Sequence, residues 1–177
     1  MAKPHACYPL WGPGLNRESY HEMKKALCGS VLAAWTLLIG GAALSADQFA
    51  SAEEARAMLD RAVTALKTNK VAALKAFNDE KNKNFRDRDL YIFCFSLPDG
   101  KFTAYQSELM LGTDVRELML DKDPIGQRAY DAVAKAAEGD IITIDFSFPK
   151  PGSKQPATKQ SLQTRIGNQA CGVSFFK

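Results

Sequence analysis

The stretch Leu90-Tyr91-Ile92-Phe93-Cys94-Phe95-Ser96-Leu97, followed by Pro98-Asp99-Gly100 and Lys101-Phe102-Thr103-Ala104-Tyr105, decides the fold. It predicts a strand, a tight turn and a second strand. The first run is β-branched and aromatic without a polar residue before Ser96, so both of its faces favour burial. Pro-Asp-Gly supplies the backbone angles and the side-chain hydrogen bond of a turn. A strand that is covered on both faces needs a helix on one side and a second layer on the other, where we expect the functional site.

Helical periodicity precedes this hairpin. Ser51 and Glu54 form a capping box at the start of a long helix. The apolar residues that follow have the three-and-four spacing of one buried stripe: Ala55, Met58, Leu59, Ala62, Val63 and Leu66. A shorter second helix is predicted from the spacing of Val71, Leu74 and Phe77.

Strand patterns dominate the rest of the chain. A short helical turn at 115–118 and a helix over 125–137 come after the hairpin. Three strands then follow over 141–148, 158–166 and 170–176, and the first of them places Ile142, Ile144, Phe146 and Phe148 on one face. This order predicts an α+β domain with a five-stranded antiparallel sheet and the long N-terminal helix on one face.

The first 45 residues have the composition of a leader. Met23-Lys24-Lys25 precedes an apolar run from Ala26 to Ala43, and Ala43-Leu44-Ser45 predicts cleavage of a signal peptide after Ser45. We interpret Met23 as the true start and 46–177 as one exported domain, periplasmic or secreted. The alternative is an uncleaved segment that anchors the chain.

The charge balance and the cysteine content limit the possible partners and the compartment of the protein. The 23 basic and 20 acidic residues are interspersed and nearly balance, so no basic face for nucleic acid is expected. Cys7 and Cys28 leave with the leader, whereas Cys94 and Cys171 remain. In an oxidising compartment this pair is expected to form a disulfide; two buried free thiols are the alternative.

Catalysis has little support in the sequence. His5 and His21 both precede the predicted cleavage point, so the mature chain has no histidine for a nucleophilic pair or a transition-metal site. The phosphate-binding and dinucleotide-binding glycine patterns are absent. Asp121 and Asp123 lack the further ligands of a Ca²⁺ loop. We therefore expect no enzyme, no cofactor and no metal.

The order of several short motifs resembles a single Cache domain of the exported, stand-alone kind. These motifs are the long N-terminal helix, residues 87–95, Asp99-Gly100-Lys101, Leu111-Gly112-Thr113-Asp114, residues 148–152 with Lys159, and Gly172-Val173. The resemblance covers Phe49 to Lys177. It implies a PAS-like extracellular sensor fold with a pocket for a carboxylate or amino-acid-like metabolite, and signal transduction or chemotaxis-type sensing through a partner protein.

The resemblance also implies positions for the disulfide and the pocket. The first and last strands of such a sheet are antiparallel neighbours, which would bring Cys94 to Cys171. Alternation places Tyr91 with Phe93 and Phe95 on one face; a core role is the simpler interpretation for the two phenylalanines, and Tyr91 fits either role. The ligand-binding candidates are Tyr91, Tyr105, Arg116, Asp123, Gln127 and Lys159.

Some positions depart from the family pattern. Phe146, Leu162 and the pair Phe175-Phe176 stand where relatives carry tyrosine. The missing hydroxyls leave an alternative function open: a structural or interaction module of the same fold that binds no ligand.

Overall fold

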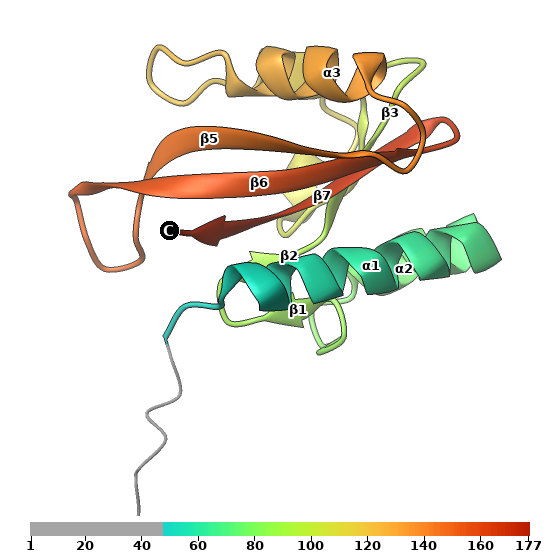
Figure 1. Cartoon of the computed structure of the whole chain (residues 1–177), viewed down its shortest axis with the longest axis horizontal. Helices are drawn as coiled ribbons and strands as arrows, with labels where there is room; N and C mark the ends of the chain where they lie inside the picture. The colour runs from blue at the N-terminus through green and yellow to red at the C-terminus, as the bar shows by residue number, and fades with distance from the viewer. Residues whose placement is uncertain (1–47) are drawn as a thin grey trace, which may run out of the picture. The chain divides into compact units, whose positions relative to one another are not determined.

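A five-stranded antiparallel sheet lies at the centre of the molecule, with α1 on one face and α3 on the other (Figure 1). The structure is a computed structural model and describes residues 48–177. The predicted leader, 1–45, lies outside the described residues. The strand order is β4-β3-β7-β6-β5, as the sequence predicts for the sheet. The helices are α1 (Ala52–Thr68), α2 (Lys70–Asn78) and α3 (Ile125–Lys135), and the strands of this sheet are β3 (Phe93–Ser96), β4 (Phe102–Ala104), β5 (Ile141–Pro149), β6 (Pro156–Ile166) and β7 (Gln169–Phe176).

The N-terminal helix begins at the predicted capping box. The Ser51 side chain accepts from the Glu54 backbone N–H, and the Glu54 carboxylate accepts from the Ser51 backbone N–H. The apolar stripe of α1 is buried against the sheet, except that Val63 is only half-buried. The predicted second helix is present as α2. Val71 lies in its first turn and is 77% exposed, because the buried face of α2 is formed by Ala73 and Phe77.

The predicted strand 90–97 begins later than expected. Leu90–Tyr91 forms a separate strand, β2, which pairs with β1 (Arg86–Asp87) in a two-stranded sheet. Arg88, in the turn between β1 and β2, has a φ of 51°. Leu90 and Tyr91 therefore pair with β1, and β3 begins only after Ile92. Leu90 and Ile92 are buried nonetheless. The unbroken apolar run therefore reflects burial of the whole stretch, although only its second half is in the main sheet.

The register of β5, β6 and β7 sets the two faces of the sheet. Pairs such as Ser161 with Ser174, and Leu162 with Val173, put successive residues of β6 on opposite sides. The hairpin joining β5 to β6 is longer than predicted, because pairing continues to Pro149 and Pro156. The 3₁₀ helices η1 (Glu108–Met110) and η2 (Val115–Glu117) lie in the connection between β4 and α3, and η2 coincides with the predicted helical turn.

The face toward α1 is a continuous apolar core. Buried side chains of α1 and α2, such as Met58, Leu59 and Phe77, pack there against the sheet. Their buried neighbours on the other side of the layer include Ile92, Leu162, Val173 and Phe175. The predicted disulfide is present within this layer. Cys94 and Cys171 are directly paired across β3 and β7 with Cα atoms 4.1 Å apart, and both side chains are buried.

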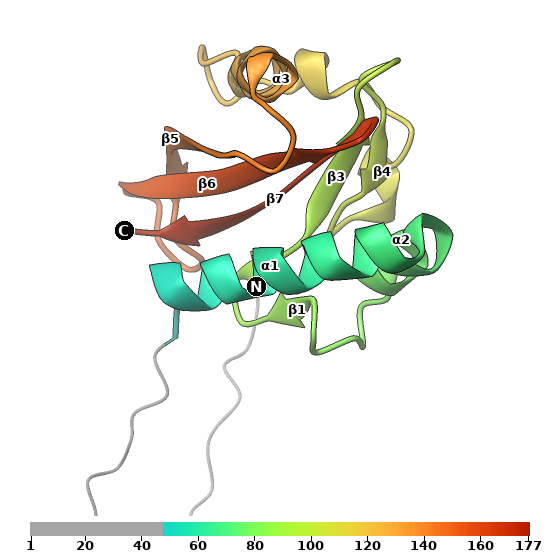
Figure 2. The ribbon, with the colours of Figure 1, turned by 45° about the vertical axis from the view of Figure 1, so that its right-hand side comes forward.

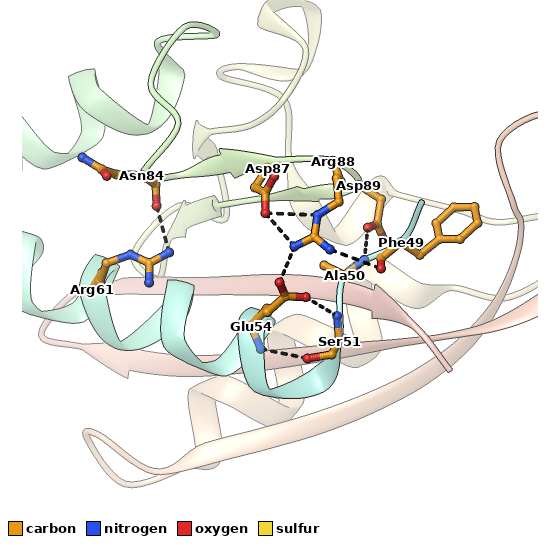
Figure 3. A network of polar contacts seen from close by, with 9 residues as sticks. All are labelled: Phe49, Ala50, Ser51, Glu54, Arg61, Asn84, Asp87, Arg88 and Asp89. Atoms are coloured by element: carbon orange, nitrogen blue, oxygen red, sulfur yellow. Dashed lines mark hydrogen bonds and ion pairs between the residues drawn. The ribbon is translucent and has the colours of Figure 1, made fainter. Parts of the chain in front are cut away.

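The β1–β2 hairpin is tied to the start of α1 by polar contacts (Figure 3). Arg88 donates to the carboxylates of Glu54 and Asp87, and the Asp89 carboxylate accepts from the Ala50 backbone N–H at 2.8 Å. These contacts hold the pKa values of Glu54 and Asp87 below their usual range, mainly through the hydrogen bonds from Arg88. The hairpin is therefore held in a fixed position beside the sheet.

Within residues 48–177, none of the helices has the length and apolar content needed to cross a membrane.

Candidate ligand-binding site

A cavity of about 510 Å³ opens on the face of the sheet that carries α3. Its walls come from the β1–β2 hairpin, from β3 and β4, from the loop around η2 and from the start of α3. Figure 2 shows α3 on the side of the sheet opposite α1. The volume lies within the range typical of small-molecule sites, which are concave and largely apolar with a few placed polar groups.

The floor of the cavity is built by three rows of paired residues across the sheet. The outermost row is Phe146, Lys159 and Phe176, and the next is Ile144, Ser161 and Ser174. In the third row, Gln163 pairs with Gly172, which also pairs with Phe93 of β3. A Cβ at Gly172 would lie 2.6 Å from the Phe93 ring, so glycine is what allows that ring to lie across the strand.

The floor is unusual because four of its buried residues are polar. Lys159, Ser161, Gln163 and Ser174 are all less than 9% exposed. Gln163 donates to the Ser161 hydroxyl at 3.1 Å, and its own side-chain oxygen has no partner among the described residues. A buried polar atom without a partner costs free energy, so the side-chain oxygen of Gln163 is a candidate contact for a ligand in the cavity.

Lys159 is the buried cation of this floor. Its amine lies 4.6 Å from the centre of the Phe176 ring, 5.8 Å from that of Phe148 and 5.9 Å from that of Tyr91. Within the described part of the chain, no carboxylate comes within 4.0 Å of this amine. Burial lowers the pKa of Lys159, and the negative charge of Asp89 partly opposes that effect. The amine is therefore held by aromatic rings and has room for an anionic partner.

Two tyrosines line the cavity beside this cation. The rings of Tyr91 and Tyr105 meet edge to face with centres 5.5 Å apart, and Tyr105 also contacts Phe102. Burial, and next the neighbouring Tyr105, hold the pKa of Tyr91 well above its usual value. Tyr91 therefore keeps its proton and can donate a hydrogen bond to a ligand.

The hairpin contributes two further buried polar atoms. Asp89 uses one carboxylate oxygen to accept from Ala50, and the other oxygen is buried without a partner in the described chain. Arg86 donates to the backbone carbonyls of Tyr105 and Gln106, which leaves its Nε buried and unpaired. Both residues line the cavity.

The structure thus brings together three of the six predicted ligand-binding residues, Tyr91, Tyr105 and Lys159, and places the other three elsewhere. Arg116 is engaged by Asp114 and stacks on Tyr130, with its guanidinium carbon 5.1 Å from the ring centre. Asp123 pairs with Arg128 at 2.6 Å. Gln127 donates to Asp131 at 2.9 Å, one turn along α3. Local partners on the same loop or helix occupy these groups, and sequence position alone does not disclose such pairs.

The positions where tyrosine is replaced divide between the two faces. Phe146 and Phe176 line the cavity, whereas Leu162 and Phe175 are buried toward α1. Only two of the four replacements therefore remove a hydroxyl from the site. Phe93, for which a core role was the simpler interpretation, also lines the cavity, while Phe95 is fully buried in the core.

Sequence reasoning found Lys159 but missed the rest of the polar floor. Lys159, Ser161 and Gln163 alternate along β6, which was a detectable signal: three polar residues on one face of an interior strand. Asp89 and Arg86 carried no such signal, because their burial depends on the fold of the β1–β2 hairpin. The residues from Gln48 onward contain no group of three His, Cys, Asp or Glu side chains placed to hold a metal ion.

Comparison with known proteins finds similar structures but no similar sequences. No protein-family model and no curated protein sequence matches the chain. A methyl-accepting chemotaxis protein from Vibrio parahaemolyticus RIMD 2210633 has a similar structure, with 20% identity and a TM-score of 0.54 over 70% of this chain and 86% of that one. A periplasmic sensor domain of a chemotaxis protein matches with 18% identity and a TM-score of 0.49 over 70% and 88%. A Cache chemosensory domain described for carboxylic acid recognition matches with 15% identity and a TM-score of 0.48 over 70% and 86%.

These similarities concern the fold. The described residues form an α+β domain with one antiparallel sheet between helices. The chemotaxis protein from Vibrio parahaemolyticus shares this fold, and the α+β class and the five-stranded antiparallel sheet agree with the prediction from the sequence.

Proposed function

We propose that this domain binds a small organic acid in the cavity on the α3 face and acts as a sensing domain. The observation that supports it is Lys159, a buried cation in a ring of aromatic side chains, with no carboxylate of the described chain within 4.0 Å. A carboxylate ligand would supply the missing counter-charge. Such a charge-assisted hydrogen bond contributes about 1.5–3 kcal/mol.

Neighbouring groups fit the rest of such a ligand. The Tyr91 hydroxyl can donate to a ligand oxygen, and Phe93, Phe146 and Phe176 offer apolar surface for a short carbon chain. In this proposal occupancy of the cavity is passed to a partner protein, in the manner of chemotaxis-type sensing.

We further propose that the domain works outside the cytoplasm, as the predicted signal peptide implies. The buried disulfide between Cys94 and Cys171 supports this location, because disulfides persist in oxidising compartments. Mass spectrometry of the exported chain is expected to find an N-terminus at Ala46. A chain that keeps residues 23–45 would contradict cleavage.

A thermal-shift screen with organic acids and amino acids at millimolar concentration tests the binding proposal. A ligand present at 100 times its Kd adds about 2.7 kcal/mol of stability, which is readily seen as a rise in Tm. Lys159→Met should abolish the rise. Lys154→Met is the matched control, since Lys154 is an exposed lysine on the β5–β6 hairpin loop. No rise with any acid would favour the alternative of a structural or interaction module.

A further inference from the structure

The surroundings of the Lys159 amine suit a nucleophile as well as a cation. It is buried among three aromatic rings and faces a cavity large enough for a metabolite. Lysines that react with carbonyl compounds have such desolvated surroundings, because only the neutral amine carries the lone pair that attacks. Burial acts in that direction here, since it lowers the pKa of Lys159.

Asp89 offers a proton acceptor in the same cavity. One oxygen of its carboxylate is fixed by the Ala50 backbone N–H, and the other is buried and unpaired in the described chain (Figure 3). Asp89 and Lys159 both line this cavity, and the negative charge of Asp89 acts on the pKa of Lys159. The unpaired oxygen is therefore the candidate acceptor for a proton from the Lys159 amine.

We propose that Lys159 forms a reversible imine with a small 2-oxo acid bound in this cavity. The neutral amine adds to the ketone carbon, and a proton moves from nitrogen to oxygen to give a carbinolamine. The hydroxyl then leaves as water with a proton returned by Asp89, and the nitrogen becomes a protonated imine. No oxidant or reductant is consumed, and addition of water reverses the reaction.

The choice of a 2-oxo acid follows from charge. A protonated imine at Lys159 would be a buried cation with no carboxylate of the described chain within 4.0 Å. The carboxylate next to the carbonyl of a 2-oxo acid supplies that counter-charge itself. An aldehyde or ketone without an acid group would leave the charge unpaired. The inference rests on the proposed function, because the acid must first enter the cavity.

Reductive trapping tests this inference. The purified chain is incubated with pyruvate and sodium cyanoborohydride, which reduces the imine to a stable secondary amine, and labelled lysines are identified by peptide mass spectrometry. Lys159 should be labelled several times faster than exposed Lys154 in the same sample, and Lys159→Met should lose the fast label. Because the two lysines are compared within the wild-type chain, the result does not depend on how well a variant folds.

Lactate distinguishes acid binding from imine formation. It has the size and carboxylate of pyruvate but no ketone group, so it should raise Tm and slow the trapping of pyruvate without forming an adduct. If either acid raises Tm while Lys159 is labelled no faster than Lys154, the imine is wrong and acid binding stands. If neither acid raises Tm and no lysine is labelled preferentially, the imine is wrong, and the full panel of acids then decides on acid binding.

Discussion

The two faces of one sheet differ in what they bury. The face toward α1 contains mainly apolar side chains and the disulfide. The face toward α3 contains Lys159, Ser161, Gln163 and Ser174 beside a cavity. Strand β6 contributes to both faces through successive residues. Because burying polar groups costs free energy, we attribute the stability of the domain mainly to the first face and place the proposed binding site on the second.

Removal of the disulfide, which lies on the face toward α1, should lower the unfolding free energy more than any other change considered. The bond spans 77 residues, so the double variant Cys94→Ala, Cys171→Ala is expected to lose about 3–5 kcal/mol of unfolding free energy. Urea unfolding of the oxidised wild type and the variant measures this difference. A loss below about 1 kcal/mol would show that the α1 face does not depend on this link.

A pair of substitutions on β6 compares the faces directly. Leu162→Ala, toward α1, should cost about 2–3 kcal/mol, because the removed side chain leaves a void in a packed core. Ser161→Ala, toward the cavity, should cost only about 1 kcal/mol, from the lost hydrogen bond with Gln163. Equal losses of unfolding free energy in urea would contradict the difference proposed between the two faces.

Lys159→Met should leave stability nearly unchanged at neutral pH, within about 1 kcal/mol, because a buried charge without an ionic partner contributes little net stability. The pH dependence is more informative. The folded-state pKa of Lys159 lies below its ordinary 10.5, so the unfolded chain holds this proton more tightly. Wild-type stability should therefore rise relative to the variant as the pH approaches 10.5. A gap between the two that stays constant with pH would argue against a desolvated amine.

The smallest expected effect concerns the loop between β4 and α3. Hydrogen bonds from Arg116 lower the pKa of Asp114 from 3.8 to about 2. This carboxylate therefore stabilises the fold above pH 3.8, and its contribution is lost as the pH falls toward 2. Asp114→Asn should flatten the acid limb of the stability curve slightly while leaving binding at Lys159 intact. A change in ligand affinity would show that the Asp114–Arg116 pair positions the η2 residues that line the cavity.

Local sequence patterns predicted most of the fold. The capping box at Ser51 and the alternation of β5 were both found in the structure. The pairing of the first and last strands, which the family resemblance implied, is also present. The pattern failed at Leu90–Tyr91, because an apolar run records burial and not the strand partner. The spacing of Val71, Leu74 and Phe77 correctly predicted α2, although Val71 itself is exposed in the first turn of that helix.

The site was harder to predict than the fold. Lys159, Tyr91 and Tyr105 were recognised from the family resemblance, and all three line the cavity. Arg116, Asp123 and Gln127 have suitable chemistry but are engaged by neighbours along the chain. Whether a charged side chain is free for a ligand depends on such local pairs, which composition does not reveal.

Calorimetric titration of the best organic acid from the screen tests the central claim most directly. Wild type, Lys159→Met and Lys154→Met are compared under one buffer condition. Loss of the charge-assisted contact should weaken binding to Lys159→Met by roughly 10- to 100-fold, whereas Lys154→Met should bind like wild type. Unchanged affinity of Lys159→Met would contradict the assignment of Lys159 as the anion-binding residue of this cavity.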